Sequence, residues 1–178
     1  MNTQQELVVQ IGSSLTQRGL LLVITESCTG GWVAQTLTSV AGSSAWFERG
    51  FVTYSNLSKQ QMLGVSPETL AAYGAVSEPV AREMVTGAVA NSAAQVGVAV
   101  TGIAGPGGGT VTKPVGTVCF AWAREGLAKE DWLLQVTTEH FAGDRQAVRQ
   151  QAVVRALQGI GEILTDSYGY SWPRIRIC

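Results

Sequence analysis

The stretch that decides the fold is Leu20-Leu21-Leu22-Val23-Ile24-Thr25-Glu26-Ser27-Cys28-Thr29-Gly30-Gly31, residues 20–31. Its first five residues are continuously apolar, which is typical of a short strand buried on both faces of a sheet. The small polar residues and glycines that follow predict a turn into a second helix, which runs to about Leu37. The order of strand, polar turn and helix favours an α/β protein.

The rest of the chain continues this alternation. A helix ending at Gly19 precedes the strand, and the apolar runs at 47–54 and 96–100 predict further strands. Asn56 is expected to cap a short helix that carries Lys59. Further helices are predicted to begin at Ser66-Pro67, Ser77-Glu78-Pro79 and Asp144. Two further strands are predicted at 115–124 and 132–137. Because the strands at 115–124 and 132–137 are consecutive, we expect a three-layer α/β/α domain with a mixed sheet.

The composition is that of a folded protein with one core. The chain has 178 residues, of which 46% are hydrophobic and 14% charged, so it can bury a core but is short for two domains. We expect a single domain over residues 1–165. Residues 166–178 show no apolar periodicity, and we expect them to form a poorly ordered C-terminal tail.

Charge and residue content argue against several classes of protein. With 12 basic and 13 acidic side chains, the chain lacks the basic surplus of a nucleic-acid binder. No apolar stretch approaches the roughly 20 residues of a membrane span, and no signal peptide is evident. Three separated cysteines and one histidine, His140, predict neither a disulfide framework nor a metal site. We expect a cytoplasmic protein that forms homo-oligomers.

Ser27 is a candidate nucleophile because it follows a buried strand and precedes a helix. The first N–H groups of a helix lack intrahelical partners and can stabilise an oxyanion. Gly30 and Gly31 would let a substrate approach the backbone. Serine and glycine before a helix are also ordinary capping residues, so this segment alone leaves both interpretations open.

A serine nucleophile needs a base, and the sequence offers two kinds. His140 is the only histidine, and it lies in a polar stretch where a surface role is equally reasonable. The alternative is a lysine whose pKa is lowered by burial. Lys59 lies five positions after Tyr54, just beyond a predicted strand, where it is either carried into a cleft or solvated on a helix.

Six segments in the same order give the chain a resemblance to the CinA C-terminal domain family, from about Leu7 to Leu164. Six motifs together are far more specific than any one of them. The chain resembles the stand-alone form, without the N-terminal domain of longer CinA proteins. The segments are Thr25–Gly31, Ala41–Phe47, Gly50–Asn56 with Lys59, Gly74–Glu78, Thr101–Pro106 and Lys113–Val118.

The resemblance implies deamidation of nicotinamide mononucleotide to nicotinic acid mononucleotide and ammonia, a step in pyridine nucleotide recycling that uses no metal or cofactor. It implies Ser27 as nucleophile, Lys59 as general base and Tyr54 as an orienting group or proton relay. The expected oxyanion and nucleotide-binding residues are Cys28, Thr29, Gly30, Gly31, Ser43, Ser44, Thr101, Gly102, Gly105 and Arg145. Arg149 is a second phosphate-side position by the same resemblance.

Two other hypotheses remain open at this point. The chain could be a module with little or no catalytic activity that binds a nucleotide or a protein partner, linked to the competence or damage responses. Its near-neutral charge and five tryptophans favour an interaction surface. Alternatively, Cys28 rather than Ser27 is the nucleophile, although no sequence feature supplies the cationic partner that a reactive thiolate needs.

Overall fold

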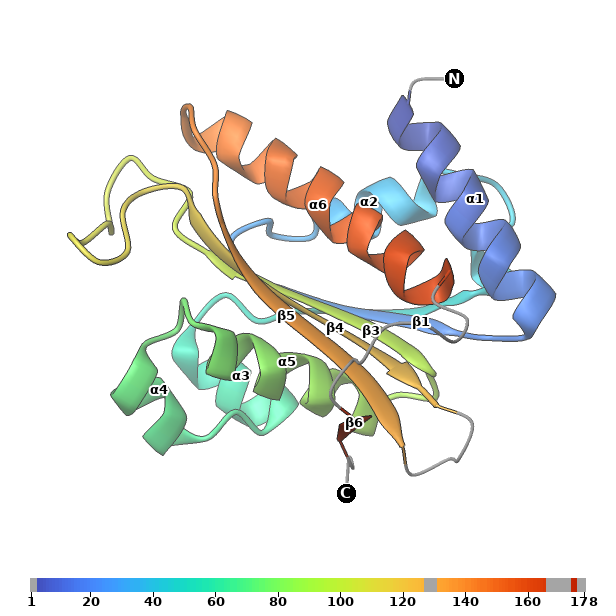
Figure 1. The fold of residues 1–178 in the computed structure, drawn as a ribbon, viewed down its shortest axis with the longest axis horizontal. Coiled ribbons are helices and arrows are strands. Elements are labelled where there is room, and N and C mark those ends of the chain that lie inside the picture. Colours follow the sequence, from blue (N-terminus) through green and yellow to red (C-terminus); the bar gives the residue numbers. More distant parts are fainter. Residues whose placement is uncertain (1–2, 127–130, 166–173, 176–178) are drawn as a thin grey trace.

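Across residues 3–126, 131–165 and 174–175, which the computed structural model describes, a six-stranded sheet lies between two layers of helices (Figure 1). The elements in chain order are α1 (Thr3–Arg18), β1 (Leu22–Glu26), α2 (Trp32–Thr38), a 3₁₀ turn (Ser43–Ala45), β2 (Phe47–Val52), α3 (Asn56–Leu63), α4 (Pro67–Tyr73), α5 (Glu78–Ala90), β3 (Val96–Gly102), β4 (Thr117–Glu125), β5 (Trp132–His140), α6 (Arg145–Thr165) and β6 (Arg174–Ile175). The expected three-layer α/β/α architecture is confirmed.

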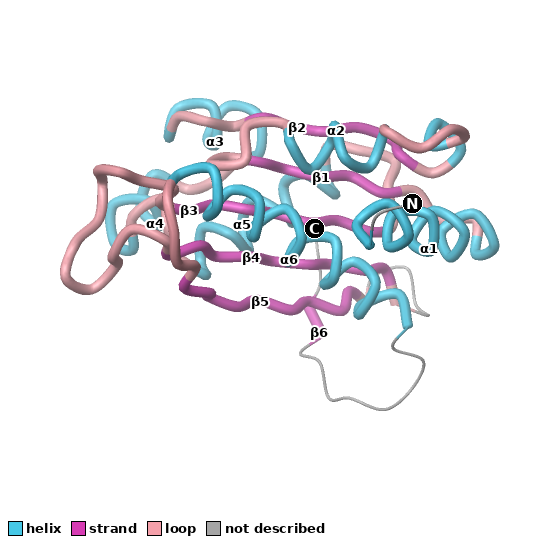
Figure 2. The backbone as a smooth tube through the Cα atoms, turned by 90° about the horizontal axis from the view of Figure 1, so that it is seen from above, coloured by secondary structure: helices cyan, strands magenta, loops and turns pink. Residues whose placement is uncertain are grey.

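The sheet is mixed, as the sequence predicts. Its strands lie side by side in the order β2-β1-β3-β4-β5-β6 (Figure 2). β1 pairs in parallel with β2 and with β3. The pairs β3–β4, β4–β5 and β5–β6 are antiparallel. The parallel part of the sheet therefore consists of β2, β1 and β3, and it carries the residues considered below.

Each face of the sheet packs against its own set of helices. α1, α2 and α6 cover one face, and α3, α4 and α5 cover the other (Figure 1). The alternation of side chains along β4 shows the difference between these faces. Phe120 and Trp122 point toward α6, whereas Ala121 and Ala123 face α5. Large residues fill one interface, while small residues let α5 lie close to the sheet on the other.

Two glycines permit close approaches between layers and helices. A Cβ on Gly159 of α6 would lie 2.1 Å from a ring carbon of Trp122, so glycine is needed where this indole packs. A Cβ on Gly87 of α5 would lie 1.9 Å from the carbonyl oxygen of Leu63, the last residue of α3. Gly87 therefore sets how closely α3 packs on α5.

The helix starts follow the sequence signals with one correction. Ser66 and Ser77 cap α4 and α5, each with a proline in the first turn, as predicted. α3 begins at Asn56, but its cap is Ser55, whose hydroxyl accepts a hydrogen bond from the N–H of Ser58. Asn56 was the wrong residue because a cap must stand just outside the helix with extended backbone, and Ser55 does so at φ −97°.

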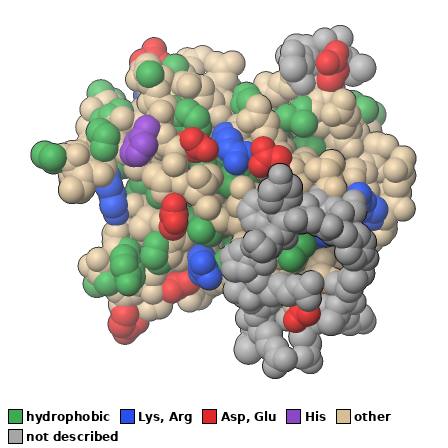
Figure 3. Space-filling model, in the orientation of Figure 1, with side chains coloured by type: hydrophobic (Ala, Val, Ile, Leu, Met, Phe, Trp, Pro, Cys, Tyr) green, Lys and Arg blue, Asp and Glu red, His purple; other side chains and the backbone are tan. Residues whose placement is uncertain are grey.

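On the face seen in Figure 3, Lys and Arg side chains are interspersed with Asp and Glu. Among the helices of the described residues, none is long and apolar enough to cross a membrane. The expected tail, residues 166–178, lies outside the described residues except for β6, which pairs with Trp132 and Leu133 of β5.

Candidate active site

The carboxyl ends of β1 and β2 form the floor of the candidate site. The two strands are parallel, Glu26 pairs with Val52, and the N–H of Thr53 donates to the carbonyl of Glu26 at 2.8 Å. The chain leaves β1 toward α2 on one face and leaves β2 toward α3 on the other (Figure 1). Adjacent parallel strands whose connections leave to opposite faces create a crevice at their carboxyl ends, where α/β proteins bind ligands.

Ser27 and Lys59 meet in this crevice, although 32 positions separate them in the sequence. Lys59 Nζ lies 3.1 Å from Ser27 Oγ and donates to the carbonyl of Thr53 at 2.7 Å. The side chains are almost fully enclosed, since Ser27 is 8% exposed and Lys59 1%. The structure therefore brings the predicted nucleophile within hydrogen-bond distance of the predicted base.

Burial sets the protonation behaviour of Lys59. Removal from water lowers the pKa of its ammonium below the ordinary value of 10.5, because a low-dielectric environment disfavours the charged form. Among the described residues, no carboxylate forms an ion pair with it. The neutral amine, which has a lone pair for a proton, is therefore more accessible than in a solvated lysine.

Glu26 is a residue of the site that the sequence reasoning missed. Its carboxylate is fully buried and accepts hydrogen bonds from the N–H groups of Gly31, Val33 and Ala34 at 2.9–3.0 Å. It thus accepts hydrogen bonds from N–H groups at the start of α2 that have no partner within the helix. A carboxylate directly before a small-residue turn and a helix is the signal that could have identified it.

Hydrogen bonds within the turn before α2 leave only some of its backbone N–H groups available to a substrate. Gly31 donates to Glu26, and Gly30 donates to the carbonyl of Ser27 at 3.1 Å. Within the described residues, the N–H groups of Cys28 and Thr29 donate to no backbone carbonyl. Thr29 is fully buried, whereas Cys28 is slightly exposed. Of the four expected oxyanion donors, Cys28 is therefore the one whose N–H donates to no backbone carbonyl and whose residue is not fully buried.

Two arginines of α6 connect the loops around the crevice. Arg149 donates from Nε to the carbonyl of Cys28 at 3.1 Å and from Nη2 to that of Thr29 at 2.9 Å. Arg145 donates to the carbonyl of Gly105 at 2.8 Å and to the hydroxyl of Tyr54 at 2.9 Å. Both guanidinium groups bind neutral oxygens, so neither positive charge is balanced by these partners.

Tyr54 lies at the rim rather than between Ser27 and Lys59. Its side chain is 59% exposed, and its hydroxyl accepts the hydrogen bond from Arg145. Among the hydrogen bonds of the described residues, none joins Tyr54 to Ser27 or Lys59. The structure therefore places Tyr54 beside Arg145 on the surface and not between Ser27 and Lys59.

The end of β3 supports the nucleophile turn from the side. A Cβ on Gly102 would lie 3.1 Å from the sulfur of Cys28, so glycine lets the turn pack against β3. The hydroxyl of Thr101 is buried and donates to the carbonyl of Ala75. Gly105, at φ +83°, offers its carbonyl to Arg145. Of these three predicted residues, Gly105 is the one that is hydrogen-bonded to Arg145, which also contacts Tyr54.

The structure does not bring Ser43 and Ser44 to the crevice. They form a 3₁₀ turn just before the amino end of β2, whereas the crevice lies beyond its carboxyl end. Six strand residues separate the two ends by about 20 Å. A residue before a parallel strand lies at the opposite edge of the sheet from a residue after it, so within this chain both serines lie away from Ser27, and their binding of substrate stays a prediction.

The alternative nucleophile and base are disfavoured by their surroundings. Burial raises the pKa of the Cys28 thiol to about 12, so the thiolate that would react is suppressed. His140 ends β5 and lies 3.3 Å from the hydroxyl of Thr117. Three strand spacings, about 14 Å, separate β5 from β1. Ser27 and Lys59 remain the reactive pair that the geometry supports.

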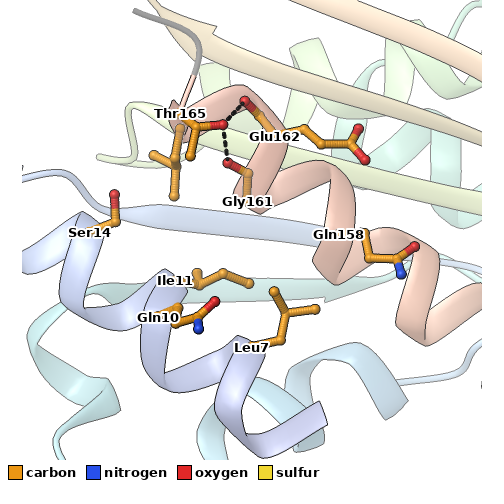
Figure 4. A pocket seen from close by; sticks show the side chains of 9 residues that line it. Leu7, Gln10, Ile11, Ser14, Gln158, Gly161, Glu162 and Thr165 are labelled. Carbon is orange, nitrogen blue, oxygen red and sulfur yellow. Dashed lines mark hydrogen bonds between the residues drawn. The ribbon is translucent and has the colours of Figure 1, made fainter. Parts of the chain in front are cut away.

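A separate pocket of about 520 Å³ lies between α1 and α6 (Figure 4). Leu7 and Ile11 line it from α1, and Gly161 and Thr165 from α6. Gly161 lies twelve residues, or about 18 Å of helix rise, beyond Arg149. None of the predicted site residues lines this pocket. Within the described residues, no group of three or more His, Cys, Asp or Glu side chains could hold a metal ion.

Known proteins share this sequence and fold. The sequence model of the CinA C-terminal domain matches residues 4–164. "Nicotinamide-nucleotide amidohydrolase PncC" of Escherichia coli K12 is 54% identical over 156 residues, which cover 86% of this chain and 90% of that protein. A "Putative competence-damage inducible protein" of Symbiobacterium thermophilum is 51% identical, but the match covers only 37% of its length.

A solved structure agrees with these matches. The competence/damage inducible protein CihA from Agrobacterium tumefaciens is 42% identical and superposes with a TM-score of 0.84, covering 92% of this chain and 96% of its own. The chain therefore corresponds to nearly the whole of the short relatives and to one part of the long ones. It belongs to the CinA C-terminal domain family.

Proposed function

We propose that this protein is an amidohydrolase that converts nicotinamide mononucleotide to nicotinic acid mononucleotide and ammonia by a Ser/Lys mechanism. The observation that carries the proposal is the 3.1 Å distance between Lys59 Nζ and Ser27 Oγ, two buried residues at the carboxyl ends of β1 and β2. The relatives named nicotinamide-nucleotide amidohydrolase, at 44–55% identity, support the choice of substrate.

The acylation step uses the neutral amine of Lys59. In the structure Nζ donates to the carbonyl of Thr53 and to Ser27 Oγ. In the reaction the neutral amine keeps its bond to Thr53, and its lone pair takes the proton of the Ser27 hydroxyl across the same 3.1 Å contact. Ser27 Oγ then attacks the carboxamide carbon, and its oxygen becomes an oxyanion near the N–H of Cys28. The C–N bond breaks as the nitrogen takes the proton from Lys59, and ammonia leaves an acyl ester on Ser27.

Deacylation repeats the same proton transfers with water. Lys59 takes a proton from a water molecule, the hydroxide attacks the acyl carbon, and the proton returns to Ser27 Oγ as the ester breaks. Nicotinic acid mononucleotide is released. One oxyanion donor is worth about 10²–10³ in rate in comparable enzymes, so the Cys28 N–H is a substantial part of this mechanism.

The nucleotide would extend from the reacting carboxamide toward the rim. Tyr54 offers an exposed aromatic ring, and Arg145 offers a guanidinium that carries no ion pair in the described structure. We assign the phosphate to Arg145, since a guanidinium suits phosphate oxygens. Homo-oligomer formation and a cytoplasmic location stay predictions.

The test is ammonia release from nicotinamide mononucleotide by the purified protein, measured with a coupled enzyme assay and confirmed by chromatography of the acid product. Ser27→Ala should reduce turnover by at least about 10³-fold. Cys28→Ala is the matched control at the neighbouring position, and it should retain most of the activity. Turnover retained in Ser27→Ala but lost in Cys28→Ala would make the thiol the nucleophile.

A different result would change the functional class. Measurable binding of the mononucleotide by the wild-type protein, with no ammonia released, would support the alternative of a binding module. Loss of activity in Lys59→Ala together with full activity in Lys113→Ala would show that the effect belongs to the buried lysine. Lys113 is a partly exposed lysine that donates to the carbonyl of Tyr73, so its replacement tests the loss of a lysine that does not contact Ser27.

A further inference from the structure

The turn that carries Ser27 has three consecutive carbonyl groups, of residues 27, 28 and 29, and each of them accepts a hydrogen bond. The carbonyl of Ser27 accepts from the N–H of Gly30 within the turn. The carbonyl of Cys28 accepts from Nε of Arg149, and that of Thr29 accepts from Nη2 of Arg149 and from the N–H of Trp32 at 3.2 Å. One guanidinium, about 120 positions away in the chain, therefore holds two of the three peptide groups that follow the nucleophile.

Arg149 is itself fixed in place. It lies in the second turn of α6, next to Val148, which is fully buried against the sheet. Its guanidinium carbon lies 5.3 Å from the ring centre of Trp32, the first residue of α2. A planar guanidinium stacked on an indole, with two donors already bonded, loses little further freedom when it orients a partner.

The orientation of the turn follows from these bonds. A trans peptide group is planar, so fixing the carbonyl of Cys28 also fixes the N–H of Thr29, which points the opposite way. The same bond limits rotation about the backbone of Cys28, the residue next to Ser27. Because displacements of about 1 Å can cost about 10²-fold in rate, a loose turn would disturb the 3.1 Å contact between Ser27 and Lys59.

We infer that Arg149 is a positioning residue that holds the Ser27 turn by the carbonyls of Cys28 and Thr29 and does not bind the phosphate. The inference rests on the proposed function for its kinetic part only. Arg145, four residues earlier on α6, differs in one respect: one of its partners is the exposed hydroxyl of Tyr54. Arg145 can exchange that partner for a substrate anion, whereas Arg149 is engaged with the backbone.

The first experiment separates turnover from substrate affinity. Arg149→Met should lower kcat by about 10- to 100-fold, change KM for nicotinamide mononucleotide little, and lower kcat for nicotinamide riboside by the same factor. Arg149→Lys should not restore kcat, because an ammonium lacks the planar pair of donors. A raised KM for the mononucleotide with unchanged kcat, and no effect with the riboside, would overturn the inference.

Arg155→Met is the matched control. Arg155 also lies on α6 and also stacks on a tryptophan, with its guanidinium carbon 4.6 Å from the ring centre of Trp122, but its ion pairs are with Glu139 and Glu162. Its replacement should leave kcat and KM within about twofold of the wild type. An equal loss of kcat in this variant would show a general effect of α6 stability and would overturn the specific role of Arg149.

The second experiment needs no activity. Amide hydrogen exchange of residues 27–31, measured on the ligand-free protein, should be at least about tenfold faster in Arg149→Met and Arg149→Lys and unchanged in Arg155→Met. Unchanged exchange in both Arg149 variants would refute the positioning role, whatever the kinetics show. Faster exchange with no ammonia from the wild-type protein would keep the positioning role and reject the proposed substrate.

Discussion

Two loops of this molecule follow the carboxyl ends of adjacent parallel strands, and both are rich in small residues. The turn after β1, residues 27–31, is held by the carboxylate of Glu26, the amine of Lys59 and the guanidinium of Arg149. The loop after β3, residues 103–116, projects away from the layers (Figure 1). Its Val111 is fully exposed, and Gly105 is its contact with Arg145.

The difference teaches which feature marks a catalytic loop. Both segments contain several glycines, and glycine allows either one to approach a ligand. Only the turn after β1 has buried charged side chains directed at its backbone and its hydroxyl. Such groups are costly to bury, so their presence indicates that the geometry of this turn matters more than that of the other loop.

Among the side chains that contact the turn after β1, Lys59 is the one whose replacement, Lys59→Met, should have the largest effect. This change removes the base and keeps an apolar stem, so kcat should fall by about 10³-fold. Stability should rise, because the folded protein no longer buries an amine. The measurements are ammonia release and the free energy of unfolding in urea. Retained turnover would remove Lys59 from the mechanism, and lower stability would show that its contact with Thr53 outweighs its burial.

Glu26→Ala should act mainly on stability. The change leaves the N–H groups of Gly31, Val33 and Ala34 without their buried acceptor, and the free energy of unfolding should fall by about 3 kcal/mol. Glu139→Ala is the control, because its ion pair with Arg155 is more exposed and should contribute less than about 1 kcal/mol. Equal losses in the two variants, measured by urea unfolding, would contradict the capping role.

The pH dependence should follow Lys59. Because burial lowers its pKa below 10.5, kcat/KM should rise about tenfold per pH unit below the lowered pKa and be flat above it. The unfolded chain binds more protons than the folded protein between the lowered pKa and 10.5. The free energy of unfolding should therefore rise with pH across that window. In Lys59→Met that rise should be absent, and its persistence would assign it to another group.

The smallest effect is expected in the second loop. A Cβ on Gly107 meets no atom within 4 Å, so Gly107→Ala should change stability by less than about 0.5 kcal/mol and leave turnover unchanged. Gly116→Ala, in the same loop, should be clearly destabilising, because φ is +94° and the Cβ would meet the carbonyl oxygen of Phe141. A tenfold loss of turnover in Gly107→Ala would show that the exposed loop takes part in the reaction.

Local patterns were enough to predict most elements of the fold, but not the 3₁₀ turn at Ser43–Ala45 or β6. The continuous apolar run at 96–100 became β3, and the serine–proline pairs at 66–67 and 77–79 became the starts of α4 and α5. These features depend on burial and capping within a few residues, so the sequence expresses them directly. The position of Ser43 and Ser44 was also predictable, since both precede a strand whose other end is followed by Lys59 on α3.

The site was predictable only in part. Ser27 could be suggested from its place before a helix and Lys59 from its place after a predicted strand, but the choice of Lys59 over His140 as the base came from the family resemblance. The roles of Glu26 and Arg149 depend on backbone groups that face them only after β1, α2 and α6 have packed together. Contacts between a side chain and a distant backbone leave no periodic pattern in the sequence.

The close packing of α5 on α3 at Gly87 has a consequence for which relatives of this protein can be active. This glycine lies in the helix layer behind the sheet, yet it sets the depth of α3, and α3 carries Lys59. A descendant with a methyl group at this position could keep Ser27, Tyr54 and Lys59 unaltered and still have its base withdrawn from its nucleophile. Possession of the three residues is thus no guarantee of catalysis, because the reacting distance is encoded in a part of the molecule that substrates do not touch.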